Sequence, residues 1–220
     1  MRSWRRRAIL VALIPGVTLF GVWWSRRMPA SQETIYEPVI APVEAAAICS
    51  WRNPGADLAR FFPAADHWTI ESLILSSQIV ELERSLGRAL TPEENPLRRH
   101  RVWRQRTAIG AVFTQRLRGE HGAIEIVLAV DDTDRVQGVS LQRMREPAGI
   151  AAALTNAGWL AAFNGGTATN RWQLGVDVPE MNAEARGSAT VVVRGVRDLL
   201  LLSQAAAKVP QPDVHLHPAE

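Results

Sequence analysis

One long hydrophobic run lies near the N-terminus, and shorter patterns of apolar residues follow it. Residues 8–24 (AILVALIPGVTLFGVWW) carry no charge, and at about 1.5 Å per residue a helix over them spans about 26 Å, enough to cross a thin hydrocarbon core. Residues 2–7 contain four arginines, whereas only Arg26 and Arg27 follow the run. The positive-inside rule therefore predicts a cytoplasmic N-terminus and one transmembrane anchor, residues 1–27. The rest of the chain is expected on the periplasmic face of a bacterial inner membrane.

Two other interpretations of this segment stay open. A cleaved signal peptide has a similar charged start and apolar core, but the following WWSRRMPA is bulky and offers no small-x-small cleavage site. Arg6 and Arg7 before the apolar run also resemble a twin-arginine signal. Pro15 and Gly16 do not argue against a retained anchor, since membrane helices tolerate both residues. We take retention as the working prediction.

Beyond the anchor, the pattern of apolar positions divides the chain into three parts. Residues 28–48 are rich in Pro, Ala and Glu without a period, which indicates a linker. Residues 49–207 are expected to fold as one domain, and residues 208–220 to form a flexible tail. Within the domain, helices are predicted over residues 57–62, 70–90, 150–163 and 188–207.

Strand patterns occupy the middle of the domain. Residues 123–130 (AIEIVLAV) place Ile124, Ile126 and Leu128 on one face of a strand. The turn 131–135 and the returning segment 136–142 complete a hairpin, and residues 108–115 and 172–176 are further strand candidates. The combination predicts an α+β fold, an antiparallel sheet with flanking helices.

Composition and charge limit the kinds of binding partner that the sequence predicts. Hydrophobic residues make up 47% and charged residues 21%, which is ordinary for a folded domain. The net charge of +3 hides clusters of arginine at the N-terminus and in residues 98–106, where Trp103 is the one aromatic residue. Nucleic-acid binding surfaces usually interleave basic and aromatic side chains, so no nucleic acid partner is predicted. The second cluster is expected to be a solvated strand edge or a patch facing lipid headgroups.

Familiar catalytic and metal motifs are missing. The chain has no Gly-x-Ser-x-Gly, no phosphate-binding Gly-x-x-x-x-Gly-Lys and no Gly-x-Gly-x-x-Gly. Cys49 is the single cysteine, which excludes an intrachain disulfide and a cysteine metal cage. His215 and His217 lie two residues apart in the predicted tail, where solvation is the simpler interpretation. No catalytic residue and no metal site are predicted, and whether the protein is an enzyme stays open.

Several short segments of the sequence follow one another in an order that is known from one protein family. They are FFPAAD at residues 61–66, LGRALTPE at 86–93, the hairpin, Arg145-Glu146-Pro147, and WLAAFNG at 159–165. Together they resemble the FMN-binding domain of membrane redox complexes. That domain occurs in the G subunit of Rnf-type complexes, the C subunit of sodium-pumping quinone reductases and the nitrous-oxide regulatory flavoproteins. The resemblance covers about residues 57–202.

The cofactor motif of that family is altered here. The family has D-x-x-[ST]-G-A-T, whose threonine carries FMN through a phosphoester made by a flavin transferase, whereas residues 184–190 read EARGSAT. The resemblance implies covalent FMN at Thr190, with Ala189 matching and Gly187 and Ser188 in exchanged order. A second register places the motif near residues 183–186 and puts Arg186 at the flavin position. A third interpretation is purely structural: Thr190 is a first-turn helix residue and Ser188 the N-cap.

Two functions follow from the resemblance. The first is a periplasmic FMN-binding-like subunit of a membrane electron-transfer complex, with the lipid bilayer, the other subunits and a flavin transferase as partners. Trp159 or Trp172 would then wall the flavin or lie in the core. The alternative is a cofactor-free structural or assembly subunit of a membrane protein complex, which keeps the fold while the motif decays.

Overall fold

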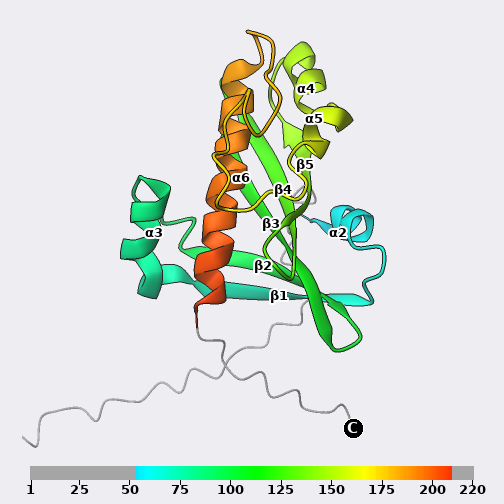
Figure 1. Ribbon diagram of the computed structural model, residues 1–220, viewed down its shortest axis with the longest axis vertical. Helices are drawn as coiled ribbons and strands as arrows, with labels where there is room; N and C mark the ends of the chain where they lie inside the picture. The colour runs from blue at the N-terminus through cyan, green and yellow to red at the C-terminus, as the bar shows by residue number, and fades with distance from the viewer. Residues whose placement is uncertain (1–52, 210–220) are drawn as a thin grey trace, which may run out of the picture. The chain divides into compact units, whose positions relative to one another are not determined.

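The computed structural model describes residues 53–209, in which one antiparallel sheet carries helices on both faces (Figure 1). Each strand pairs with the next along the chain. The strands are β1 (His67–Ile74), β2 (Pro96–Arg104), β3 (Thr107–Arg118), β4 (Ala123–Asp131) and β5 (Val136–Met144). The helices are α2 (Gly55–Phe61), the 3-10 turn η2 (Leu75–Gln78), α3 (Ile79–Leu86), α4 (Ala148–Leu154), α5 (Ala157–Ala161) and α6 (Arg186–Ala207). The predicted α+β class with an antiparallel sheet is confirmed.

Strand β4 is buried on both faces, because its successive side chains point in opposite directions. One set of its side chains joins the larger hydrophobic cluster, which includes α6: Ile124, Ile126, Leu128 and Val130. The other set packs against Leu58 and Phe62 at α2: Val127 and Ala129. The predicted shared face of Ile124, Ile126 and Leu128 is confirmed.

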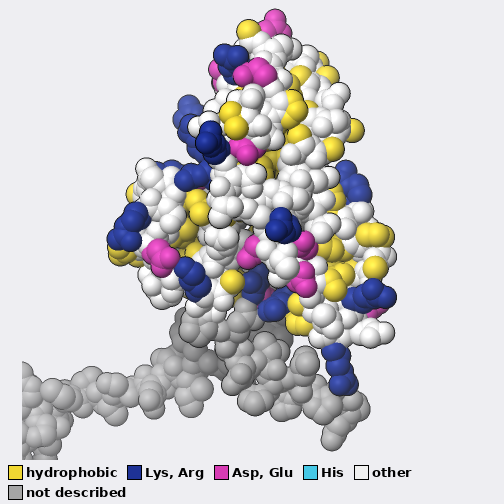
Figure 2. All heavy atoms as spheres, in the orientation of Figure 1, with side chains coloured by type: hydrophobic (Ala, Val, Ile, Leu, Met, Phe, Trp, Pro, Cys, Tyr) yellow, Lys and Arg dark blue, Asp and Glu magenta, His cyan; other side chains and the backbone are white. Residues whose placement is uncertain are grey.

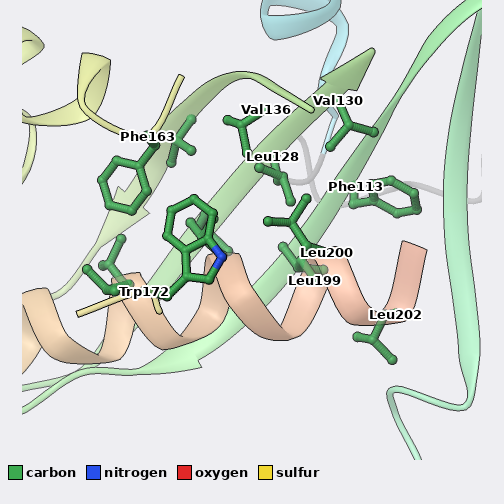
Figure 3. Packing of buried hydrophobic residues seen from close by; sticks show 14 of the residues in the cluster. Phe113, Leu128, Val130, Val136, Phe163, Trp172, Leu199, Leu200 and Leu202 are labelled. Carbon is green, nitrogen blue, oxygen red and sulfur yellow. The ribbon is translucent and has the colours of Figure 1, made fainter. Parts of the chain in front are cut away.

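Helix α6 lies along one face of the sheet and supplies much of the core. Figure 3 shows Leu199 and Leu200 pointing toward the strands, with Trp172 between Phe163 and the helix. The helix approaches β3 closely at Gly195, where an added methyl group would overlap the side chain of Leu117. The start of α6 is therefore held against the sheet by packing along the rest of the helix.

Several predicted elements need correction. Residues 70–90 are not one helix, because β1 extends to Ile74 and only η2 and α3 are helical. Trp68, Ile70 and Ile74 are exposed on one face of β1 and Leu73 is buried on the other, and the strand pairs along its whole length with β2.

The arginine cluster at residues 98–106 lies largely in strand β2, as one of its two interpretations predicted, but β2 is paired on both sides, with β1 and β3, and is not at the edge of the sheet. The segment 172–176 contains no strand, only an isolated bridge between Leu174 and Val178.

The helix predicted over residues 150–163 is two helices, α4 and α5. Asn156 separates them, since its side chain accepts a hydrogen bond from the Trp159 backbone N–H at 3.1 Å and caps α5. The other predicted elements are confirmed: the helix at 57–62, the strand at 108–115, the hairpin of 123–142 and the last helix.

Part of the sequence-based interpretation lies outside the described residues. This holds for the anchor 1–27, the linker 28–48, Cys49, His215, His217 and all but the first two residues of the tail 208–220. Among residues 53–209, no helix has the length and apolar character needed to cross a membrane.

Candidate functional site at the start of α6

The first turn of α6 is organised by Asn182 rather than by Ser188. The Asn182 side chain accepts a hydrogen bond from the Ala185 N–H at 2.9 Å, and its carbonyl accepts one from the Arg186 N–H at 3.0 Å. Ala185 is the N-cap residue and makes no side-chain capping bond. The interpretation of Ser188 as the N-cap is therefore wrong, because the helix begins two residues earlier, at Arg186.

The four predicted site residues face two different environments. Ala189 and Ser188 are fully buried, and Gly187 is half-buried. Thr190 is exposed, and its hydroxyl donates a hydrogen bond to the Arg186 carbonyl at 2.8 Å. The structure thus places an exposed threonine at the fifth residue of a long helix, just past a first turn whose inner side is packed.

A residue that the sequence did not single out completes this site. Glu120, in the turn between β3 and β4, donates its backbone N–H to the Ser188 hydroxyl at 3.1 Å. Its carboxylate lies directly against Gly187, where an added methyl group would overlap it. A carboxylate at the start of a helix interacts favourably with the helix dipole, by roughly 0.3–1 kcal/mol. No local pattern links residues 120 and 187, because only the fold brings them together.

Arg186, the flavin position of the second register, is also exposed. Its Nε lies 3.2 Å from Glu180, and both side chains are about half exposed. Exposed ion pairs of this kind contribute little to stability, about 0–1 kcal/mol. Arg186 thus faces an acidic neighbour next to the turn that precedes α6.

Both tryptophans considered as flavin walls are core residues. Trp159 is 5% exposed and donates its ring N–H to the Pro179 carbonyl at 3.1 Å. Trp172 is 6% exposed, stacks on Phe163 with ring centroids 5.9 Å apart, and donates to the Thr167 carbonyl at 2.8 Å (Figure 3). Each indole therefore has its polar group satisfied and its ring faces packed in protein.

Thr190 suits a flavin phosphate as an attachment residue, whereas the space around the helix start does not suit the phosphate. The hydroxyl of Thr190 fits as an attachment atom, because it is exposed. The space at the helix start does not suit a second anion as it stands, since Gly187 and Thr190 are neighbours on the helix surface and the Glu120 carboxylate already lies there. A phosphate on Thr190 therefore requires the Glu120 carboxylate to move away from Gly187.

The described residues contain no cluster of three or more His, Cys, Asp or Glu side chains able to hold a metal ion. No protein-family model matches the chain, and no curated protein matches it.

Proposed function

We propose that this chain is a membrane-anchored, periplasmic, FMN-binding-like subunit of a membrane electron-transfer complex, with Thr190 as the flavin attachment residue. The observation that carries the proposal is the exposed position of Thr190 directly after the first turn of α6. The α+β fold and the hydrophobic N-terminal run support it, because an exported redox domain requires both a folded scaffold and a tether.

The chain would position the cofactor rather than perform chemistry of its own. Bound FMN supplies the electron transfer. Buried Ala189 and Ser188 fix the first turn of α6, so that the Thr190 oxygen has a defined place above the sheet. The N-terminal end of the helix favours an anion through its backbone N–H groups and dipole.

The second candidate is a cofactor-free subunit that stabilises a membrane complex. The position of Glu120 favours it, because this carboxylate supplies from within the chain the negative charge that a phosphate would bring to the start of α6. The burial of Trp159 and Trp172 also leaves neither ring available to stack on a flavin.

Co-expression of the full chain with a flavin transferase separates the two candidates. We expect intact-mass spectrometry to show one FMN adduct on the parent and none on Thr190→Val. Thr155→Val is the matched control, since Thr155 is also exposed and its hydroxyl donates to a carbonyl four residues earlier, that of Ala151, at 2.8 Å. Its adduct should equal that of the parent.

Glu120→Gln tests whether the carboxylate opposes the phosphate. The substitution removes the charge at nearly constant shape, so we expect a higher fraction of flavinylated chain than in the parent. If parent and Glu120→Gln both lack an adduct and both lack flavin absorbance, the cofactor-free candidate stands instead.

A further inference from the structure

A cavity lies on the side of the sheet opposite α6. Glu125 lines it, and Glu125 faces away from Ile124 and Ile126 because successive strand residues alternate. Arg116 on β3 and Arg143 on β5 are the cross-strand partners of Glu125, so the register brings both onto the same face. Arg145, His121 and Gly122 of the β3–β4 turn, and Ala123 at the start of β4 complete the lining of this open cavity, whose volume is about 340 Å³.

The lining of this cavity is strongly basic. Its lining residues include three arginines, His121 and a single acidic residue. That residue, Glu125, is 5% exposed and its carboxylate accepts a hydrogen bond from the Arg116 Nε at 2.5 Å. On the α6 side, by contrast, Figure 2 shows basic side chains intermixed with acidic and apolar ones. The arginines that line the cavity are exposed and Arg116 is already paired with Glu125, so solvent weakens their mutual repulsion, but the excess of positive charge still favours a bound anion.

Backbone geometry fixes Arg145 at the cavity. Its N–H donates to the Ala123 carbonyl at 2.9 Å. A methyl group added at Gly122 would come within 2.6 Å of the Arg145 Cβ, so glycine is required for this close approach. The side chain of the next residue, Glu146, accepts a hydrogen bond from the His121 N–H at 3.4 Å. This bond joins the segment after β5 to the β3–β4 turn. The guanidinium of Arg145 therefore extends from a backbone held at two points.

We propose that this cavity binds a phosphate-bearing anion. Guanidinium groups recognise phosphate through paired, charge-assisted hydrogen bonds, and three arginines are among the residues that line this cavity. Its volume lies at the lower end of the range for small-molecule sites, roughly 300–1,000 Å³. The phosphate can belong to a soluble ester or to a lipid headgroup. The site is separate from Thr190 and does not depend on flavin attachment.

The experiment uses the full chain in non-ionic detergent at low ionic strength, titrated with inorganic pyrophosphate by calorimetry. We expect saturable binding by the parent and a loss of affinity of about tenfold or more in Arg143→Gln/Arg145→Gln, since charge-assisted hydrogen bonds are the strong ones. The matched control is Arg104→Gln/Arg106→Gln, which removes two exposed arginines outside the lining and should bind like the parent. Unchanged thermal unfolding shows that each variant is folded.

Mixed micelles identify the source of the phosphate. Competition with pyrophosphate by phosphatidylglycerol, but not by phosphatidylcholine, assigns the site to anionic headgroups, and absence of competition assigns it to soluble phosphates. The proposal is overturned if the parent shows no saturable binding of pyrophosphate and no phosphatidylglycerol-specific binding. It is also overturned if the cavity variant and the control lose affinity equally.

Discussion

Replacing Arg88 with methionine is expected to leave two buried carboxylates without their shared cation. The Arg88 guanidinium donates to Asp198 on α6 at 2.7 and 3.2 Å, and to Glu94 in the segment before β2 at 2.7 and 2.8 Å. Asp198 is only 4% exposed, and the Glu94 side chain is 9% exposed. The arginine thus joins the C-terminal helix to the segment that leads into β2.

The cost follows from what remains after the substitution. Removing one partner of a buried ion pair costs about 3–5 kcal/mol, because an uncompensated charge stays behind. Asp198 keeps a second cation, since the Arg197 Nη1 lies 3.4 Å from it, and the Arg88 side chain is itself 36% exposed to solvent. We therefore expect a loss near the lower end, about 3 kcal/mol. Domains of this kind have total stabilities of roughly 5–15 kcal/mol, so the loss is readily measurable.

Urea unfolding of the full chain in detergent, followed by tryptophan fluorescence, measures this loss. Arg84→Met is the control, because Arg84 is exposed on α3 and should change stability by less than about 0.5 kcal/mol. The two outcomes that refute the reasoning are a loss in Arg88→Met below about 1 kcal/mol and an equal loss in both variants.

Acid provides a second test of the same ion pair. Burial raises the pKa of Glu94, but hydrogen bonds from Arg88 and from the Thr91 backbone outweigh it, so the pKa is lowered overall. A lowered folded-state pKa gives stability that is present above the unfolded value and is lost as the pH falls through the folded value. The difference between parent and Arg88→Met should therefore shrink below about pH 4.5. A difference that stays constant into acid contradicts this assignment.

Three further expectations concern the scaffold. Ile126→Asp places a charge in a fully buried position of β4 and should cost several kcal/mol, about enough to unfold the domain; a parent-like urea midpoint would show that the strand faces are misassigned. Gly195→Ala should raise the unfolding rate, because the methyl group overlaps Leu117 on β3, whereas Ala at exposed Gly149, which meets no atom within 4 Å, should not. Burial lowers the pKa of His100, partly opposed by a hydrogen bond with the Val112 backbone, so its contribution to stability is present above about pH 6.5 and is lost below it. His100→Asn should remove this part of the acid sensitivity, and an unchanged profile would assign it to other groups.

Elements that are buried along most of their length were predicted from the sequence more accurately than elements that are partly exposed. Strand β4 and helix α6 carry long apolar patterns that match their buried faces, and both were predicted close to their observed bounds. Edge strand β1 exposes Trp68, Ile70 and Ile74, so its pattern lacked a clear buried face and was joined to the helix that follows. Strand β2 was predicted only as one alternative for residues 98–106 and without bounds, because arginines occupy many of its positions, including Arg99, which pairs with Glu71 of β1.

The sequence indicated only part of the candidate site. The pattern at residues 187–190 correctly located the start of the last helix to within two residues, and it singled out the hydroxyl that the fold exposes. Glu120 gave no signal, because an acidic residue in a turn ordinarily faces solvent. Its contact with Gly187 depends on the packing of α6 against the β3–β4 hairpin, a relation between segments far apart in the chain.

One measurement addresses the central claim most directly. Trypsin cleaves after Arg186 and Arg194, so residues 187–194 (GSATVVVR) form a single peptide in which Ser188 and Thr190 are the hydroxyl-bearing side chains. After co-expression of the full chain with a flavin transferase, fragmentation of this peptide should place the mass of one FMN on Thr190. An unmodified peptide from a preparation that also lacks flavin absorbance contradicts the account, as does an FMN adduct on any other residue.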